Sequence, residues 1–258
     1  MNAISCRGLR KSFGDFEVLR GIDLEVEPGE LFGFIGPNGA GKTTTIRVLA
    51  GLLLPSAGTV HVAGYDVVQS AREAKRRVGY VPDRAFLYPK LTAREFLEFV
   101  GHLYEQDPRD VARVYTPLLE RFDLSEWTDE LIESYSHGMR QKLALTAAMI
   151  HEPEILVIDE PMVGLDPRSA RVMKTILADL VAGGRTVFLS THTLAIAEEL
   201  CSRVAIVHRG LVAAQGTLDE LRVQAMTEGS LEAVFLRLTE GESIATEEHM
   251  VRPLRAAQ

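Results

Sequence analysis

The first thirty residues alternate short β-rich runs with turn residues, a pattern that predicts strands. The runs lie around Ile4–Arg10, Phe16–Arg20 and Ile22–Val26. Gly14-Asp15 and Pro28-Gly29 are turn signals that separate strands. The chain therefore begins with three short strands joined by tight connections.

A compact apolar run follows and precedes a glycine-rich loop. Leu31–Ile35 has no polar position, which is typical of a strand buried on both faces in a parallel sheet. A helix is expected from about Gly41 to Ala50, with Gly51 just past its end.

Residues 85–150 have a helical period instead of strand signals. The periodic stretches are LTAREFLEFVGHLYE, RDVARVYTPLLERF and GMRQKLALTAAMI. Thr92 and Glu95 have the spacing of a capping box that opens the first of these helices. Pro117 is expected to interrupt the second one, because proline removes a helical hydrogen bond. The segment is interpreted as a helical sub-domain inserted between strands.

Strand–helix alternation then resumes, which predicts a parallel α/β sheet covered by helices. The expected elements are strand Ile155–Ile158, helix Pro167–Val181, strand Thr186–Ser190, helix Leu194–Cys201, strand Val204–His208 and short helices Leu218–Gln224 and Ser230–Leu238. From about Glu240 the sequence is polar and unpatterned, so a frayed tail is expected. We expect one main domain over residues 1–225, with 85–150 inserted in it, and a C-terminal helix and flexible tail over 226–258.

The composition is ordinary for a soluble globular protein, with 46% hydrophobic and 25% charged residues among 258. A net charge of −8 disfavours non-specific binding of nucleic acid. Cys6 and Cys201 match no metal or redox spacing, so free thiols in a reducing compartment are expected. No run of about 18 apolar residues is present, and the N-terminus lacks the apolar core of a signal peptide. A cytoplasmic protein is expected, and any work at a membrane would go through a partner.

The segment GPNGAGKTT fits G-x-x-x-x-G-K-[ST] and lies between a predicted strand and a predicted helix. Glycines let backbone N–H groups converge on a phosphate, and the helix N-terminus adds its dipole. Lys42 is expected to reach the β- and γ-phosphates, and the Thr43 hydroxyl is expected to bind Mg²⁺. A simple glycine-rich turn is the alternative. The candidate nucleotide-binding residues are Gly36, Pro37, Asn38, Gly39, Ala40, Gly41, Lys42, Thr43 and Thr44.

Two adjacent carboxylates end the apolar run EILVIDEP. Asp159 is interpreted as the Walker B aspartate that holds Mg²⁺, and Glu160 as the group that polarises an attacking water. Such a pair alone is weak evidence, because strands often end in solvated acids. Together with the phosphate loop, it predicts hydrolysis of a nucleoside triphosphate.

YSHGMRQ, between the phosphate loop and the Walker B strand, resembles the signature of the ATP-binding cassette (ABC) ATPases, usually written LSGGQ. Ser136 and Gly138 match that signature, whereas His137 and Met139 depart from it. A serine and free N–H groups at a helix start make a second anion site. Without the resemblance, the segment would be interpreted as a helix cap.

Other segments match the same family in the same order. Phe13 in KSFG corresponds to the aromatic residue that stacks on adenine, although an isolated phenylalanine would more often belong to a core. VGLDP resembles the D-loop and contributes Asp166, and STHT places His192 where the family's switch histidine contacts the γ-phosphate. These residues complete the set that the resemblance implies for ATP binding.

One position departs from the family. After Gly79–Pro82 the family normally has a glutamine, and this chain has Asp83. An aspartate adds negative charge close to the γ-phosphate and is still a ligand for Mg²⁺. We expect a metal-side or gating role for Asp83, with a solvated loop carboxylate as the alternative.

The resemblance covers about residues 3–225. It implies a P-loop α/β fold with a parallel core sheet, an N-terminal antiparallel β sub-domain and the inserted helical sub-domain. Two subunits, identical or paralogous, would close head-to-tail with ATP and Mg²⁺ between them, and Lys42, Glu160 and His192 would carry out hydrolysis. The residues of these motifs look most like those of ATPase subunits of ABC-2-type exporters, which transport drugs, lipids or polysaccharides.

The resemblance also implies a membrane permease as partner, docked around Asp83–Phe99, and a place at the inner face of the cell membrane. No nucleic-acid partner is expected. A soluble family member acting on nucleic acid or ribosomes is the alternative function, but the chain has one cassette and no coiled coil. A small-molecule kinase would not explain YSHGM, VGLD and STHT.

Overall fold

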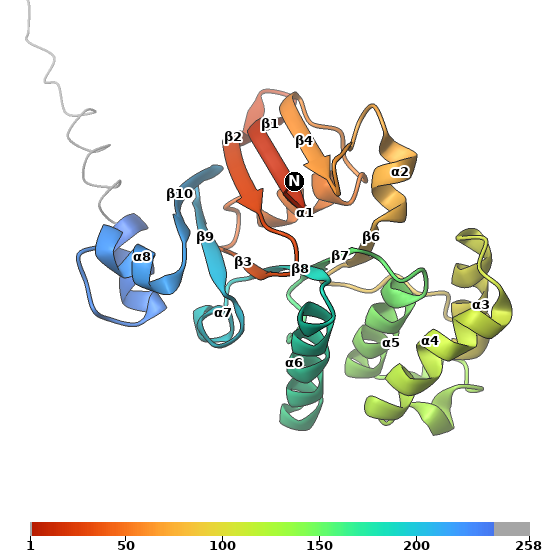
Figure 1. Ribbon diagram of the computed structural model, residues 1–258. Coiled ribbons are helices and arrows are strands. Elements are labelled where there is room, and N and C mark those ends of the chain that lie inside the picture. Colours follow the sequence, from red (N-terminus) through yellow and green to blue (C-terminus); the bar gives the residue numbers. More distant parts are fainter. Residues whose placement is uncertain (1, 240–258) are drawn as a thin grey trace, which may run out of the picture.

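The computed structural model describes residues 2–239 of the chain. Two β-sheets lie one above the other, and a group of helices packs at one end of the larger sheet (Figure 1). The strands are β1 (Ile4–Phe13), β2 (Phe16–Val26), β3 (Leu31–Ile35), β4 (Ala57–Val62), β5 (Tyr65–Asp66), β6 (Val78–Val81), β7 (Ile155–Asp159), β8 (Thr186–Thr191), β9 (Arg203–His208) and β10 (Leu211–Gly216). The α-helices are α1 (Lys42–Leu49), α2 (Ala71–Arg76), α3 (Ala93–Leu103), α4 (Pro108–Arg121), α5 (His137–Met149), α6 (Pro167–Ala182), α7 (Leu194–Leu200) and α8 (Leu218–Gln224).

The N-terminal sheet has four strands in the order β2-β1-β4-β5, all paired antiparallel. The prediction of two separate strands over 16–20 and 22–26 is wrong, because they form the single strand β2. Gly21, which lies between the two runs, has φ 121°, a conformation that glycine adopts without strain. The register shifts between β1 and β2 absorb the irregularity as bulges.

The larger sheet has six strands in the order β10-β9-β3-β8-β7-β6. Its first five strands in sequence, β3 and β6 to β9, are parallel to their neighbours, as the strand–helix alternation predicts, and β10 is an antiparallel edge. All of β3 and β7 is buried. On β7, Ile155 and Val157 belong to a different apolar cluster from Leu156 and Ile158, because side chains alternate between two covered faces.

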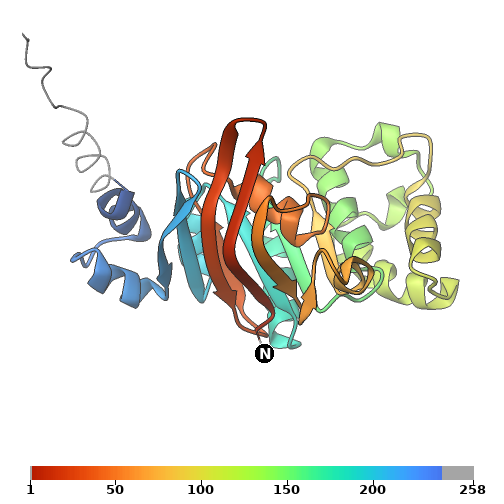
Figure 2. The ribbon, with the colours of Figure 1, turned by 90° about the horizontal axis from the view of Figure 1, so that it is seen from above.

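Different elements cover the two faces of this sheet. Helix α1 and the N-terminal sheet lie on one face, and α6 and α7 lie on the other (Figures 1 and 2). The view from above shows the strands of the N-terminal sheet crossing over those of the larger sheet (Figure 2). The phosphate loop between β3 and α1 therefore begins at an interior strand of the larger sheet.

Three helices occupy the segment 85–150, as the helical period predicts. The capping box at the start of α3 is confirmed, since Thr92 accepts from the Glu95 N–H and the Glu95 carboxylate accepts from the Thr92 N–H. The expected interruption at Pro117 is wrong, because α4 is continuous. Val111, Tyr115 and Leu119 are buried along one face of α4, and this packing on both sides of the proline compensates for the missing hydrogen bond.

Several elements were not assigned from the sequence. These are β4, β5, α2, β6 and β10. The expected helix Leu218–Gln224 is confirmed as α8, with a capping box formed by Thr217 and Glu220. Residues 231–239 are helical, in agreement with the predicted second short helix. The expected frayed tail falls on residues 240–258, outside the described part of the chain.

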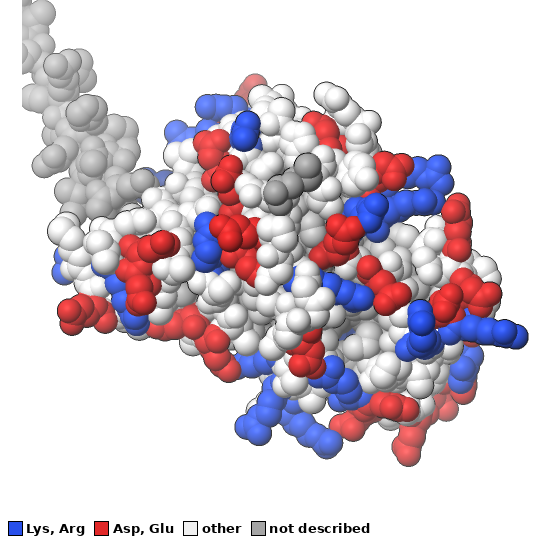
Figure 3. Space-filling view, in the orientation of Figure 1, with Lys and Arg blue, Asp and Glu red and all other residues white. Residues whose placement is uncertain are grey.

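The distribution of charged side chains and the state of the two cysteines can be compared with the expectations from the composition. On the face drawn in Figure 3, lysine and arginine side chains are interspersed with acidic ones, so no continuous basic surface forms there. Cys6 and Cys201 are free, and burial raises the pKa of each thiol to about 12. Within residues 2–239, no helix has the length and apolar character needed to cross a bilayer.

Candidate active site at the ends of the parallel strands

The phosphate loop runs from the end of β3 to the start of α1, and its glycines are needed where the backbone packs closely. A Cβ on Gly36 would lie 2.3 Å from the Val207 carbonyl oxygen of β9. Gly41 has φ 107° and caps α1, and a Cβ there would lie 2.6 Å from Leu19 Cδ2. The loop is therefore packed on β2 and β9 and holds the N-terminus of α1 toward solvent.

Lys42 is the first residue of α1, and its ammonium folds back over the loop. Its Nζ donates to the carbonyl oxygens of Gly36 at 2.7 Å and Pro37 at 3.1 Å. Burial lowers the pKa of Lys42, and the nearby carboxylates of Glu160 and Asp159 oppose this effect. The ammonium charge of Lys42 is thus stabilised by two backbone carbonyl groups and by nearby carboxylates, and it faces the loop in which an anion would bind.

Asp159 ends β7 and is 2% exposed. Its Oδ2 accepts from the hydroxyl of Thr43, a residue of the phosphate-loop motif, at 2.9 Å. Burial raises the pKa of Asp159, while the hydrogen bond from Thr43 opposes the increase. A buried carboxylate beside a hydroxyl gives two oxygen ligands of the kind that hard divalent cations prefer.

Glu160 follows Asp159 and turns the chain away from the sheet. It has φ 50°, a left-handed conformation that is unusual for a residue with a side chain. Its carboxylate points to the end of β8 and makes three contacts there. Oε1 accepts from the His192 N–H at 2.9 Å and contacts His192 Nδ1 at 2.6 Å, and Oε2 accepts from the Thr191 hydroxyl at 3.0 Å.

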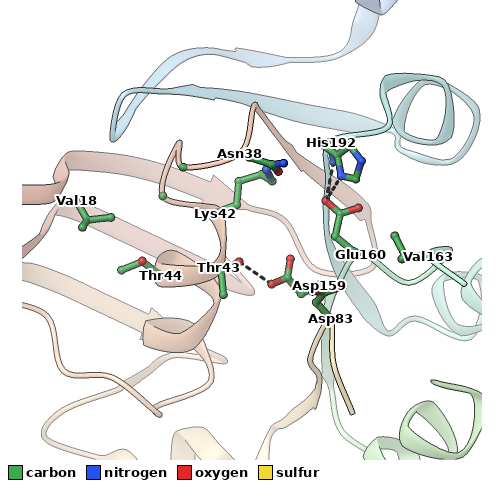
Figure 4. A pocket seen from close by; sticks show the side chains of 12 residues that line it. Val18, Asn38, Lys42, Thr43, Thr44, Asp83, Asp159, Glu160, Val163 and His192 are labelled. Atoms are coloured by element: carbon green, nitrogen blue, oxygen red, sulfur yellow. Dashed lines mark hydrogen bonds and ion pairs between the residues drawn. The ribbon is translucent and has the colours of Figure 1, made fainter. Parts of the chain in front are cut away.

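These residues surround one cavity of about 370 Å³ (Figure 4). The residues that line it are Val18, Asn38, Gly39, Gly41, Lys42, Thr43, Thr44, Asp83, Asp159, Glu160, Val163 and His192. The structure therefore brings together the phosphate loop, the paired carboxylates and His192, which are separate in the sequence. Asp83 also lines the cavity, so the position where the family has glutamine faces the same space.

The signature segment lies outside this lining. Ser136 is the N-cap of α5, and its hydroxyl accepts from the Met139 N–H at 3.3 Å. Helix α5 begins against the D-loop: a Cβ on Gly164 would lie 2.2 Å from His137 Cδ2, and one on Gly138 would lie 3.1 Å from the Gly164 carbonyl oxygen. The imidazole that replaces the first of the two usual signature glycines therefore packs on the D-loop of its own chain.

A second cavity, of about 470 Å³, lies on the signature side. It is lined by Asp83, Arg84, Ala85, His137, Arg140 and Val163. Asp83 and Val163 line both cavities, so the Asp83 loop and the D-loop form a shared wall between the phosphate loop and the signature helix.

Other predicted nucleotide-binding residues also lie outside the lining of the first cavity, namely Gly36, Pro37 and Ala40 of the phosphate loop, Phe13 and Asp166. Phe13 is 51% exposed at the end of β1, with the Lys11 ammonium 5.2 Å from its ring centroid. Asp166 caps α6, accepting from the Ser169 N–H at 2.9 Å and from the Ser169 hydroxyl at 2.6 Å, and the same hydrogen bonds lower the pKa of Asp166 to about 2. Val18 on β2 lines the cavity but was missed, since a single valine in a strand carries no signal of a site.

A phosphate loop after β3, two carboxylates at the end of β7 and a histidine after β8, which lies between these two strands, define a P-loop nucleoside triphosphatase. The profile described as "ABC transporter" matches residues 19–163, more than half of the chain. The chain belongs to the ABC transporter family and is an ATP-binding ATPase of that family.

Individual relatives agree. The chain is 43% identical over 222 residues to the daunorubicin resistance ATP-binding protein DrrA3 of Streptomyces coeruleorubidus, covering 86% of this chain and 70% of the relative. It is 39% identical over 219 residues to the Nod factor export ATP-binding protein I of Paraburkholderia xenovorans, covering 85% and 72%. A solved ATP-binding subunit of an ABC transporter superposes with a TM-score of 0.87 at 33% identity, covering 92% of this chain and 99% of that one.

Proposed function

We propose that the protein powers export of an organic molecule through a separate membrane permease, as the ATP-hydrolysing subunit of an ABC-2-type transporter. The observation that carries this proposal is the cavity in which Lys42, Asp159, Glu160 and His192 meet at the ends of parallel strands. The relatives named above are a drug-resistance protein and a Nod factor export protein, which supports export over a role with nucleic acid or ribosomes. The proposal includes the expected domain boundaries, with an ATPase domain over residues 1–225, a helical sub-domain inserted at 85–150 and a C-terminal segment over 226–258.

The residues around the cavity fit ATP and Mg²⁺. The Lys42 ammonium and the N-terminus of α1 suit phosphate oxygens, and Thr43 with Asp159 would hold Mg²⁺. Within residues 2–239, no cluster of three or more His, Cys, Asp and Glu side chains could hold a metal, which suits a cation that takes its other ligands from phosphates and water. When bound, the nucleotide and its cation supply the γ-phosphate and neutralise its charge.

Each side chain then has a defined task in hydrolysis. Glu160 Oε1 or Oε2 accepts the proton of the attacking water, and Lys42 holds the β- and γ-phosphate oxygens. His192, which is half exposed beside Glu160, turns toward the γ-phosphate. Asp83 acts on the metal side of the cavity. Phe13 and Val18 form the adenine side, Phe13 by stacking.

Ser136 and Gly138 bind the nucleotide held by a second subunit. The support for this trans arrangement is that they lie outside the lining of the cavity formed by their own chain, while the helix start at Ser136 is exposed. Asp166 would contact the partner near the same interface. The permease docks on the segment Asp83–Phe99, where Phe86 and Tyr88 are exposed, and this docking places the protein at the inner face of the membrane.

A complementation experiment tests the trans site. Lys42→Ala and Ser136→Ala are each expected to be inactive alone. Mixed in equal amounts, they also form mixed dimers, in which one site carries both changes and the other carries none. Roughly a quarter of the wild-type ATPase rate should return in the mixture, because about half of random dimers are mixed and each has one intact site. No recovery, in a mixture shown by pull-down to contain mixed dimers, would refute the trans arrangement.

A further inference from the structure

Thr191 occupies a central place between the two halves of the site. It is the last residue of β8 and is 2% exposed. Thr191 pairs with Ile35 of the neighbouring strand β3, the residue before the phosphate loop. The preceding residue, Ser190, pairs with Asp159 of β7, the neighbouring strand on the other side. The side chain is therefore fixed by the sheet backbone next to both functional strands.

The Thr191 hydroxyl has a defined direction. Its oxygen accepts from the Thr193 N–H at 3.0 Å, and the hydroxyl donates to Glu160 Oε2 at 3.0 Å. An N–H group only donates and an ionised carboxylate only accepts, so the hydroxyl proton must point to Glu160. This is a charge-assisted hydrogen bond from a buried donor.

The carboxylate of Glu160 needs such a donor because backbone hydrogen bonds fix its main chain but not its side-chain torsions. The Glu160 N–H donates to the Ser190 carbonyl oxygen at 2.9 Å, and the Glu160 carbonyl oxygen accepts from the Val163 N–H at 3.2 Å. These contacts hold Glu160 in its left-handed conformation, whose energetic cost persists only where the surroundings enforce it. Of the other two donors to it, the His192 ring belongs to a half-exposed side chain, which in the proposed function turns toward the γ-phosphate, whereas the His192 N–H belongs to the backbone. The Thr191 hydroxyl and the His192 N–H thus remain on different oxygens of Glu160 when the ring moves.

We propose that Thr191 is a positioning residue for hydrolysis, which holds the Glu160 carboxylate in the orientation in which it accepts a proton from water. This inference rests on the proposed role of Glu160 as the base. Thr191 does not touch the phosphate loop through any hydrogen bond that the structure shows, so its effect falls on turnover and not on nucleotide affinity.

The test compares Thr191→Val with Thr186→Val. The two threonines lie at opposite ends of β8, each is 2% exposed, and each hydroxyl accepts a backbone N–H, from Thr193 and from Gly29. The valine is nearly isosteric in both. The two variants should therefore lose similar thermal stability, and only the Thr191 variant should lose function. Thr191→Ser restores the hydroxyl, and Thr191→Ala replaces Thr191→Val if the latter does not fold.

We expect kcat of Thr191→Val to fall at least about tenfold, since a misplaced base loses part of its roughly 10²–10⁴-fold contribution, with KM for ATP within about twofold. Thr191→Ser should recover most of kcat, and Thr186→Val should keep the wild-type rate. A crystal structure of nucleotide-free Thr191→Val should show the Glu160 carboxylate displaced from the end of β8. Binding of ATP, measured by calorimetry, should be unchanged.

The outcomes separate this inference from the proposal beneath it. If Glu160→Gln retains turnover, the assignment of the base fails and the inference fails with it. If Glu160→Gln is inactive but Thr191→Val is as active as Thr186→Val, the base stands and the positioning role of Thr191 is refuted. Equal losses of kcat in Thr191→Val and Thr191→Ser would likewise refute it, because the hydroxyl would then be irrelevant.

Discussion

Replacing Gly164 by alanine is expected to destabilise the protein through one specific contact, with His137. Gly164 has φ +78°, and a Cβ there would lie 2.2 Å from His137 Cδ2 and 2.8 Å from His137 Nε2. Gly184 is a matched control. It has φ +84° and nothing within 4 Å of an added Cβ, so alanine there carries the backbone cost without the collision.

The magnitudes follow from these two geometries. A left-handed alanine costs about 1–2 kcal/mol, and the stiffer unfolded chain returns about 0.4–1 kcal/mol of it. Gly184→Ala should therefore lower the free energy of unfolding by about 1 kcal/mol. Overpacking costs about 1–3 kcal/mol in a well-packed core. His137 is exposed and its ring can move aside, so we expect the low end of that range, about 1 kcal/mol, at Gly164 alone. At about 2–4 °C per kcal/mol for a chain of this size, Tm of Gly164→Ala should lie roughly 2–4 °C below that of Gly184→Ala.

The assay is thermal unfolding of the four combinations with His137→Ala, which removes the colliding ring atoms. On that background the difference between Gly164→Ala and Gly184→Ala should disappear, because only the backbone cost remains. If the two alanines are equally destabilising in both backgrounds, the signature helix does not rest on the D-loop in solution and the reasoning is refuted. A difference that survives His137→Ala would show that another contact is responsible.

Four further predictions concern the candidate site and its supports. Phe13→Ala should weaken ATP binding by about 1–3 kcal/mol, or roughly 5- to 150-fold in Kd measured with a fluorescent nucleotide, because a stacking surface is lost; an unchanged Kd would exclude stacking. Asp83→Ala should raise the Mg²⁺ concentration needed for hydrolysis while Asp83→Gln restores activity, and unchanged Mg²⁺ affinity and rate in both would remove its direct role. Thr92→Ala removes the cap of α3 and should cost about 1 kcal/mol, seen as a lower Tm, whereas wild-type stability would contradict the capping geometry. The lowered pKa of Asp166, about 2, lies below the unfolded value of about 3.9. Its carboxylate therefore stabilises the fold above about pH 4 and loses this effect as pH falls through about 2, so unfolding measured against pH should show wild type losing stability relative to Asp166→Asn in that window.

Much of the parallel core could be predicted because local and tertiary signals agree there. Strands such as β3 and β7 are apolar at every position, which only a sheet covered on both faces explains. The phosphate loop and the Asp159–Glu160 pair follow from the same strands, since parallel strands deliver their last residues to one edge. The parallel order of these strands alone therefore implies that the phosphate loop and the Asp159–Glu160 pair line one cavity.

The errors and omissions come from interactions between distant segments. Gly21 looks like a break in the sequence, but pairing with β1 carries the strand through it. Pro117 looks like a helix end, yet packing of Val111, Tyr115 and Leu119 keeps α4 intact. In the same way, no local pattern indicates that Thr191 bonds to Glu160, since the contact depends on the register of β7 and β8.

The burial of Cys6 and the partial burial of Cys201 have a practical consequence for experiments on assembly. Because burial raises the pKa of each thiol to about 12, both stay protonated at neutral pH, and the thiolate is the form that alkylating reagents attack. A cysteine introduced on the surface will therefore take up a fluorescent or spin label selectively in the otherwise unaltered chain. Distances between labels on the two chains of the proposed dimer can then be measured without first removing the native cysteines.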